Sequence, residues 1–302
     1  MIDSKKKKKK DSQHLVPKVY LKHWRIEEGK NFVYGIDFSD KFKRYVQTFG
    51  LNDKAFTQRR YYNDNSLKNP YIIEDFLGQD IEPSYEIIMS EVNNEQNLSQ
   101  SVREKIIQWL YYSKMRSPYI RTNLERATNF IYKTIERLEN ESLHPEMEKT
   151  IEQHSKKLAK QIQLNTFTDE GKFKAILSLY IKTLNAKNWK ILKSNPGFPF
   201  LTNDNPGFSL NTVERFAIDV PFHYVLEMNS SSIILYPLSP KYCLEITPFE
   251  TRTPLDICAM TVNIVYEKVS NQTIEFINKG ILYTCNKLII SNNKETIEKY
   301  IY

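Results

Sequence analysis

The hydrophobic period changes along this 302-residue chain, and that change constrains the fold more than any single motif. Between residues 101 and 184 apolar residues recur every three or four positions, which is typical of amphipathic helices. After Asn188 the period falls to two, in short segments separated by Pro, Asn, Gly and Ser, which is typical of antiparallel strands. β-rich segments also precede the helical middle. The pattern therefore predicts an α+β fold, with a helical middle layer packed against a mostly antiparallel sheet.

Shorter elements are predicted on both sides of the helical middle. They are a helix over 17–24, an N-terminal hairpin over 32–49, a helix from 71 that breaks near 78–82, strands over 189–193, 198–202, 233–238 and 242–246, and a helix over 256–280. Pro83 imposes the break, because proline lacks the backbone donor that a continuous helix needs. Ser101 and Glu104 have the spacing of a capping box and predict a helix start. Residues 282–291 fit a strand or a helix equally well.

The positive charge of the chain is concentrated in one short run. Lys and Arg exceed Asp and Glu by 43 to 36, and six of the seven net positive charges belong to residues 5–10. Like charges repel one another, so we expect residues 1–13 to be a disordered basic arm and residues 14–302 to form a single α+β domain. The lysines of the run can contact phosphates and are candidate nucleic-acid-binding residues: Lys5, Lys6, Lys7, Lys8, Lys9 and Lys10.

A second candidate for nucleic-acid contact is Arg59-Arg60-Tyr61-Tyr62. Arg59 and Arg60 next to two aromatic rings combine cations with stacking surfaces, as proteins that bind single strands do. The structural alternative is a solvated surface segment. No helix-turn-helix or zinc-finger pattern accompanies it.

The three cysteines and the hydropathy of the chain bear on its location. Cys243, Cys258 and Cys285 have no metal-ligand spacing, and we expect reduced thiols in a cytoplasmic protein. No stretch of 18 apolar residues occurs, so no membrane span is expected.

Four short phrases occur in a recognisable order: His14–Trp24, Arg116–Pro118, Thr202–Pro206 and Tyr236–Pro240. Their order and spacing resemble the bacterial family catalogued as domain of unknown function 4238, over about residues 14–290. Two positions depart from the family's pattern, with Ser117 in place of Thr and Asn203 in place of Ser. Both departures keep a small polar side chain.

The resemblance implies a layout and a set of positions, but no activity. Carried over residue by residue, these positions are His14, Pro17, Tyr20, Leu21, Arg116, Asp204, Asn205, Pro206 and Ser239. The carboxylates of Glu74 and Glu82 also look similar to a pair in the family.

Some of these residues suit phosphodiester chemistry. Neutral His14 is a candidate general base, and the Arg116 guanidinium can hold a phosphate through two parallel bonds. Asp204 and Glu82 can orient His14 or bind a metal, and Mg²⁺ or Mn²⁺ would suit the acidic cluster Glu74, Asp75, Asp80, Glu82 and Glu86. Each residue also has a structural interpretation, as a cap, an ion pair or a turn former. We predict that His14, Arg116 and Asp204 share one cleft.

Three functions fit these observations. The leading hypothesis is a phosphodiester-acting or nucleic-acid-binding effector, of which a nuclease in bacterial antiphage defence is one candidate, with nucleic acid or a protein from the same operon as partner. The alternatives are a non-catalytic interaction or sensor protein of a defence system, and an enzyme that acts on a small phosphate-bearing substrate. The sequence lacks the motifs of zincins, P-loop ATPases, Rossmann dehydrogenases and standard serine hydrolases. In an enzyme the three side chains should converge on an open pocket, whereas in an interaction protein each should be satisfied separately.

Overall fold

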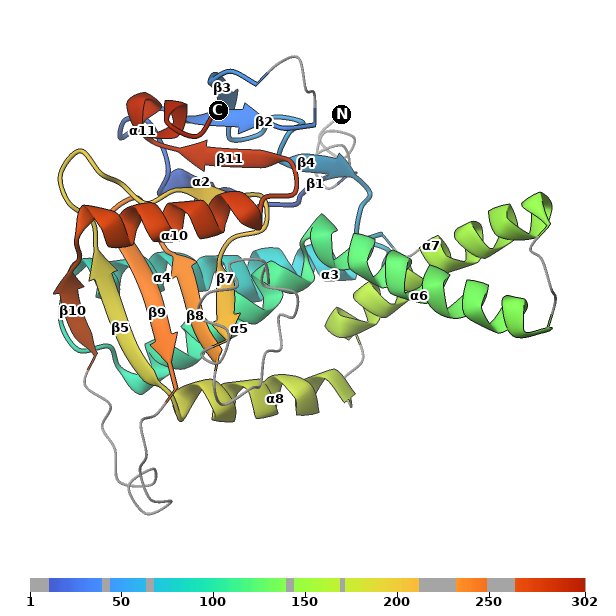
Figure 1. Ribbon diagram of the computed structural model, residues 1–302. Coiled ribbons are helices and arrows are strands. Elements are labelled where there is room, and N and C mark those ends of the chain that lie inside the picture. The colour runs from blue at the N-terminus through green and yellow to red at the C-terminus, as the bar shows by residue number, and fades with distance from the viewer. Residues whose placement is uncertain are drawn as a thin grey trace, which may run out of the picture.

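The computed structural model describes residues 11–39, 44–63, 68–139, 144–168, 172–211, 232–248 and 264–301. Two sheets and a layer of helices enclose a hydrophobic core, and a long helical hairpin projects away from this body (Figure 1). The predicted α+β class is confirmed. The six-lysine run lies outside the described residues.

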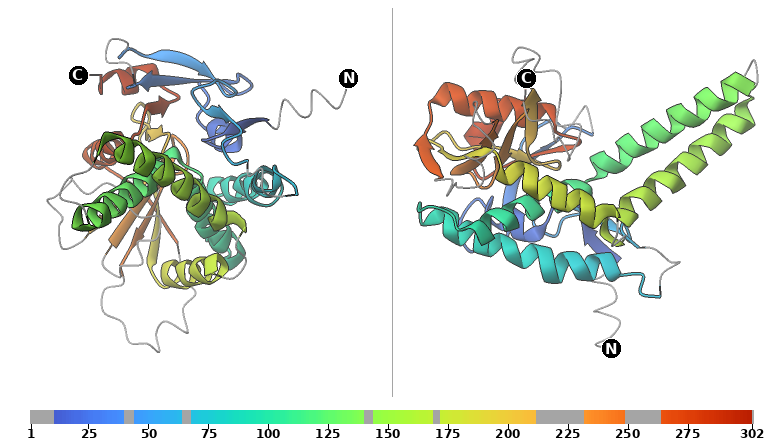
Figure 2. Two further views of the ribbon diagram at one scale, coloured as in Figure 1. Left: turned by 90° about the vertical axis from the view of Figure 1, so that its right-hand side faces the viewer. Right: turned by 90° about the horizontal axis from the view of Figure 1, so that it is seen from below.

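The larger sheet has five strands in the order β10-β5-β9-β8-β7. Their bounds are β5 Asn188–Lys193, β7 Phe208–Asn211, β8 Ser232–Pro237, β9 Tyr242–Thr247 and β10 Val265–Lys268. Neighbouring strands are antiparallel except for β10 and β5, which pair in parallel. Helix α10 (Asn271–Tyr283) covers one face of this sheet, and helices α4 (Glu82–Asn93) and α5 (Gln100–Met115) cover the other (Figures 1 and 2). Coverage on both faces explains why nearly every residue of β8 is buried.

The smaller sheet has the order β3-β2-β11-β6 and is antiparallel throughout. It consists of β2 Phe32–Asp37, β3 Gln47–Gly50, β6 Thr202–Asn203 and β11 Leu288–Ser291. Strands β2 and β3 form the hairpin predicted from the sequence. Gly35 is needed in β2, because a Cβ there would meet the Phe49 ring at 2.9 Å. The third sheet joins only β1 (Ser12–His14) to β4 (Thr57–Arg59).

Apart from α11, which was not predicted, the remaining helices follow the predicted apolar stripes. They are α2 Lys18–Lys22, α3 Ile72–Phe76, α4 Glu82–Asn93, α5 Gln100–Met115, α6 Pro118–Glu139, α7 Pro145–Thr168, α8 Lys172–Asn185 and α11 Lys294–Glu298. The predicted break is a π-helical turn over Leu77–Ile81, after which Pro83 stands in the first turn of α4. The predicted capping box is wrong by two residues, because Ser99 is the N-cap of α5 and accepts from the Val102 amide at 3.3 Å.

Three other boundaries differ from the sequence-based prediction. Ser12 and Gln13, which were predicted to belong to the disordered arm, lie in β1 and pair with β4. Residues 256–263 of the predicted 256–280 helix lie outside the described residues. In the rest of that range β10 forms a strand, and the helix starts only after Ser270, whose hydroxyl accepts from the Thr273 amide at 3.1 Å. The predicted 198–202 strand shrinks to β6, since Pro199 cannot donate to a ladder.

Large aromatic side chains fill the core between α2, α4, α5 and β8. The Tyr85 and Trp109 ring centroids are 4.2 Å apart, and Tyr20 lies 5.5 Å from Tyr85 and 6.2 Å from Tyr236. Each such ring buries about 150–250 Å² and so dominates the local packing energy. This cluster brings the first and last of the four sequence phrases into contact.

None of the helices in the described parts of the chain combines the length and apolarity that a membrane crossing requires.

Candidate functional site

Arg116 ends helix α5 and is buried, with 1% of its surface exposed. Its Nη1 donates to Glu82 Oε1 at 2.8 Å, and its Nη2 donates to the His14 carbonyl oxygen at 2.5 Å. Burial acts to lower the pKa of Arg116, but Tyr62, Glu82 and Glu74 outweigh it and hold that pKa above its ordinary value. The guanidinium predicted to hold a phosphate therefore stays charged and joins α5 to α4 and to the end of β1.

His14 meets Arg116 through its backbone and not through its ring. The imidazole Nε2 lies 3.2 Å from the Leu51 carbonyl oxygen, which can only accept, so Nε2 carries the proton of the neutral ring. Burial lowers the pKa of His14, and the nearby Arg116 charge lowers it further. Because Nε2 carries the proton, Nδ1 of the neutral ring can accept one, as a general base must.

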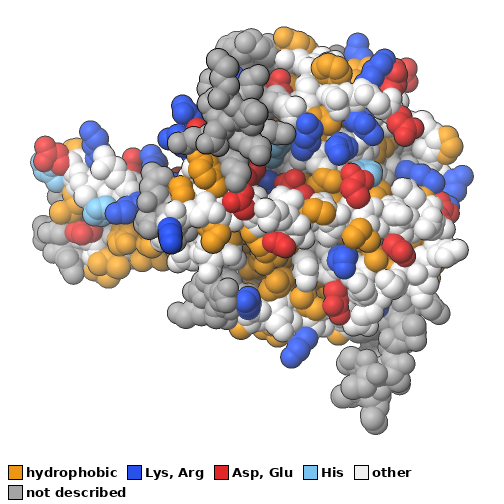
Figure 3. Space-filling model, turned by 180° about the vertical axis from the view of Figure 1, so that it is seen from behind, with side chains coloured by type: hydrophobic (Ala, Val, Ile, Leu, Met, Phe, Trp, Pro, Cys, Tyr) orange, Lys and Arg blue, Asp and Glu red, His pale blue; other side chains and the backbone are white. Residues whose placement is uncertain are grey.

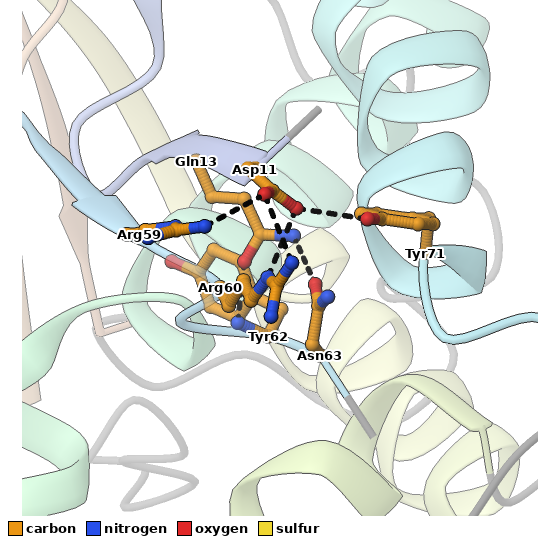
Figure 4. A network of polar contacts seen from close by, with 7 residues as sticks. All are labelled: Asp11, Gln13, Arg59, Arg60, Tyr62, Asn63 and Tyr71. Carbon is orange, nitrogen blue, oxygen red and sulfur yellow. Dashed lines mark hydrogen bonds and ion pairs between the residues drawn. The ribbon is translucent and has the colours of Figure 1, made fainter. Parts of the chain in front are cut away.

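The residue before β1, Asp11, organises a polar network at the edge of the β1–β4 pair (Figure 4). Its carboxylate accepts from Arg60 Nε at 3.1 Å and from the Tyr71 hydroxyl at 2.8 Å, and Arg59 Nη2 lies 3.5 Å away. The hydrogen bonds from Arg60 and Tyr71 lower the pKa of Asp11 to about 2. Asp11 thus balances part of the positive charge of Arg59 and Arg60, the residues predicted to contact nucleic acid.

The aromatic part of the predicted nucleic-acid segment is not available for stacking. Tyr61 and Tyr62 are both buried, and the Tyr62 hydroxyl donates to the Arg116 carbonyl oxygen at 2.6 Å. Gln13 fixes the same turn, with its Oε1 accepting from the Tyr62 amide at 2.6 Å (Figure 4). The Arg59 side chain is 75% exposed, so the segment presents cations to solvent without stacking rings.

Asp204 follows β6 and binds the loop between α10 and β11. Its two carboxylate oxygens accept from the amides of Asn286 and Lys287, both at 2.9 Å. Burial raises the pKa of Asp204 to about 6, against the opposing effect of these amides. The preceding Asn203 accepts from the Asn205 amide at 2.8 Å and donates to Thr284 Oγ1 at 3.0 Å. The turn is therefore bonded internally on several sides.

Lys114, which was not among the residues predicted from the sequence, holds the same turn from helix α5. Its Nζ donates to the Asn205 carbonyl at 2.9 Å, to Asn205 Oδ1 at 3.0 Å and to the Gly207 carbonyl at 2.9 Å. Burial lowers the pKa of Lys114 well below its ordinary value. Its spacing of four residues from Leu110, on the apolar stripe of α5, was a signal that this lysine is buried.

Tyr20 and Ser239 complete an internal framework made by the four phrases. The Tyr20 hydroxyl lies 2.6 Å from Thr202 Oγ1 and donates to the Pro237 carbonyl at 2.8 Å. Ser239 Oγ accepts from the Tyr242 amide at 3.2 Å and so closes the turn before β9. The two bonds of Tyr20 connect segments that are more than a hundred residues apart in the sequence.

The predicted catalytic residues fall into two groups. His14, Arg116 and Glu82 are joined by the bonds described above, whereas the Asp204 carboxylate is bonded to the 286–287 backbone. Among the described residues no hydrogen bond or ion pair links Asp204 to His14 or Arg116. A cleft shared by all three stays a prediction.

The side chains of the predicted acidic cluster do not converge, and two of them bind different basic residues. Glu82 binds Arg116, and Glu86 lies 3.3 Å from His23 Nε2. Across the described segments no three His, Cys, Asp or Glu side chains converge on a point where a metal ion would sit. A cavity of about 400 Å³ between α10 and α11 is lined by residues such as Asn278 and Lys299 and by none of the predicted catalytic residues.

The most exposed apolar surface lies on the helical hairpin of α6 and α7, which extends away from both sheets (Figures 1 and 2). We call it the hairpin face and define it by six residues: Phe130, Ile131, Ile135, Leu138, Met147 and Leu158. Leu138 is 83% exposed and Phe130 72% exposed. Figure 3 shows apolar side chains gathered along one side of this projection.

Gln163 fixes the base of the hairpin to the body. Its Nε2 donates to the Met115 carbonyl at 2.7 Å and to the Ser117 carbonyl at 3.2 Å, at the junction of α5 and α6. Its Oε1 accepts from Arg121 Nε at 2.7 Å, and Arg121 also donates to the Tyr61 carbonyl at 3.0 Å. The hairpin is thus anchored at its base and carries an apolar face along its length.

The chain belongs to the family described as protein of unknown function DUF4238, whose sequence profile matches residues 12–295. This confirms the resemblance carried by the four phrases. No curated protein and no solved structure matches the chain.

Proposed function

We propose that this member of the DUF4238 family is a non-catalytic interaction protein that binds another protein through the α6–α7 hairpin. The observation that carries the proposal is the hairpin face, an apolar surface on an element that projects from the body (Figure 2). A helix in a globular protein normally buries its apolar stripe against the core. A projecting pair of helices with an exposed stripe is suited to burying it against a partner.

The hairpin has two apolar sides, and only one of them is used internally. Ile151, Ser155 and Ala159 of α7 are buried against α6, and Thr128 Oγ1 donates to the Ser155 carbonyl at 3.4 Å. The hairpin face lies beside this contact and faces solvent. Contiguous apolar patches of several hundred Å² on a monomer are commonly interaction sites.

The bonding of the family-pattern residues also favours an interaction protein over the phosphodiester hypothesis. Arg116 is bonded to Glu82 and to the His14 carbonyl, and Asp204 to backbone amides. Side chains that close internal contacts are those expected of a scaffold. Tyr61 and Tyr62, the two rings next to exposed Arg59 and Arg60 in the sequence, are buried, which weakens the case for single-strand binding.

The proposal places the protein in the cytoplasm, with antiphage defence as the hypothetical setting. Cys243 is buried, and burial raises the pKa of its thiol well above the ordinary value. A buried, protonated thiol suits a reducing compartment.

Site-specific photo-crosslinking in bacteria that express the chain tests the interaction. The photoreactive p-benzoylphenylalanine replaces Ile131 or Leu138 on the hairpin face, and Gln153 on the exposed polar side of α7 serves as the matched control. We expect protein adducts from the two face positions and none from the control. Equal adduct formation at all three positions, or none at any, would overturn the proposal.

A nuclease assay on purified protein tests the competing hypothesis directly. We expect no hydrolysis of DNA or RNA above background with Mg²⁺ or Mn²⁺. Hydrolysis that is lost in His14→Ala would replace the interaction proposal with the phosphodiester one.

A further inference from the structure

We infer that the partner bound by the hairpin face is a second copy of this chain, paired antiparallel about a two-fold axis. The inference rests on the proposed function and names its partner. It starts from the charge pattern of α7. A charged residue followed by an apolar one occurs twice in α7. The first pair is Glu146-Met147, and the second, eleven residues later and with the opposite charge, is Lys157-Leu158.

Eleven residues are about three helical turns, so the two steps lie on the same edge of α7. A two-fold axis midway between them exchanges the two positions. Glu146 then meets Lys157 of the partner subunit, and Met147 meets Leu158 of the partner subunit. A parallel pairing would instead place Glu146 beside Glu146 of the partner subunit, which like-charge repulsion disfavours. The charge pattern therefore selects the antiparallel arrangement.

Contacts within the hairpin place α6 relative to this axis. Thr128 Oγ1 bonds the Ser155 carbonyl, and Lys133 Nζ lies 3.3 Å from Glu148 Oε1. These two contacts put Ile131 close to the level of the axis, where it approaches Ile131 of the partner subunit. The tip of one hairpin then reaches the level of Leu158 on the other, which is still 36% exposed. The bodies of the two copies lie beyond the overlap.

The size and shape of the hairpin face suit such a pair. The six side chains expose roughly 500 Å² of apolar surface per chain, and a standard interface buries about 800 Å² per partner, a little over half of it apolar. Two antiparallel hairpins that meet on one apolar side form a four-helix arrangement with a single apolar interior. Figure 3 shows apolar side chains gathered along one side of the hairpin, the side that such a partner would cover.

Sedimentation velocity on the purified full chain, from about 1 to 200 μM, tests the inference. We expect a reversible dimer. Ile131→Glu places two like charges at the axis and should weaken the dimer at least 100-fold, whereas Leu179→Glu, at a half-exposed leucine of α8, should leave it unchanged. A wild-type monomer at 200 μM, or an Ile131→Glu dimer of unchanged affinity, would overturn the inference.

Charge exchange tests the orientation without changing the apolar face. Glu146→Lys should weaken the dimer about 10-fold, and Glu146→Lys/Lys157→Glu should restore it to within about twofold. A double variant that stays as weak as the single one would exclude the antiparallel pairing. A wild-type monomer that still crosslinks to a different protein through Ile131 would discard the second copy as partner and leave the proposed interaction function standing.

Discussion

Replacement of Arg116 by methionine tests whether this residue holds the framework together. Methionine keeps most of the side-chain volume, so the loss is chiefly electrostatic. Removal of one partner of a buried ion pair costs about 3–5 kcal/mol. Glu82 is one-quarter exposed and can regain water, which reduces the cost, whereas the His14 carbonyl oxygen loses its charged donor. We therefore expect Arg116→Met to lower the free energy of unfolding by about 3 kcal/mol.

Urea unfolding followed by tryptophan fluorescence measures this change, because Trp24, Trp109 and Trp189 are all buried. With an m value of about 3 kcal/mol/M, suited to a chain of this size, the midpoint should fall by about 1 M. Protein concentration must be held constant, since a dimer would make stability depend on it. Arg126→Met, on the exposed side of α6, is the matched control and should change stability by less than about 0.5 kcal/mol.

A loss below about 1 kcal/mol with an unchanged m value would refute the reasoning. It would mean that the guanidinium is not needed for folding, and that its charge is held ready for an anionic ligand. A double-mutant cycle with Glu82→Gln sharpens the result. If the ion pair is structural, the coupling energy between the two positions should be at least about 1 kcal/mol.

Three further predictions follow from other bonds. Burial raises the pKa of Asp204 to about 6 from an ordinary 3.8, so the folded state binds a proton more readily than the unfolded chain. The free energy of unfolding should therefore fall by up to about 3 kcal/mol between pH 4 and 7, and Asp204→Asn should remove that slope in urea titrations. Tyr20→Phe removes the hydroxyl that bonds Thr202 and Pro237 and should cost about 1–2 kcal/mol by the same method. Deletion of Lys5–Lys10 should leave the calorimetric melting temperature unchanged, because the run has no apolar residue to bury, and if fluorescence anisotropy detects a salt-dependent DNA affinity of the full chain, the deletion should abolish it.

Hydrophobic periodicity predicted most of the fold, because burial is decided by which face of an element is apolar. The helices of the middle followed from it, whereas the β2–β3 hairpin was predicted from β-rich segments and the break from Pro83. The failures lie where tertiary pairing outweighs local pattern. Strand β10 is only four residues long and mostly exposed, and its pairing with β5 depends on distant residues that no local window contains. The start of α5 was misplaced because Ser99 and Ser101 both suit an N-cap by type.

The candidate site was harder to predict, because residue type does not reveal exposure. Arg116 and Asp204 lie at element ends, as predicted, yet a charged residue at an element end can face a ligand or a neighbouring backbone equally well. Tyr61 and Tyr62 next to two arginines resemble a stacking surface in the sequence, but burial removes both rings from solvent. The burial of Lys114 could be predicted only from its position on the apolar stripe of α5, because a buried lysine needs internal hydrogen-bond acceptors.

The framework and the hairpin face are physically linked through the end of α5. Arg116 and Ser117 follow directly on this helix, and Pro118 begins α6, so the bonds that fix Arg116 also fix the point from which the hairpin departs. Gln163 of α7 bonds the carbonyls on both sides of Arg116 and ties the returning helix to the same junction. Because the hairpin is held at both of its basal ends, its direction relative to the body is set by these buried polar contacts. A residue such as Arg116 can therefore matter for binding at the hairpin face without touching the partner, by determining where that face points.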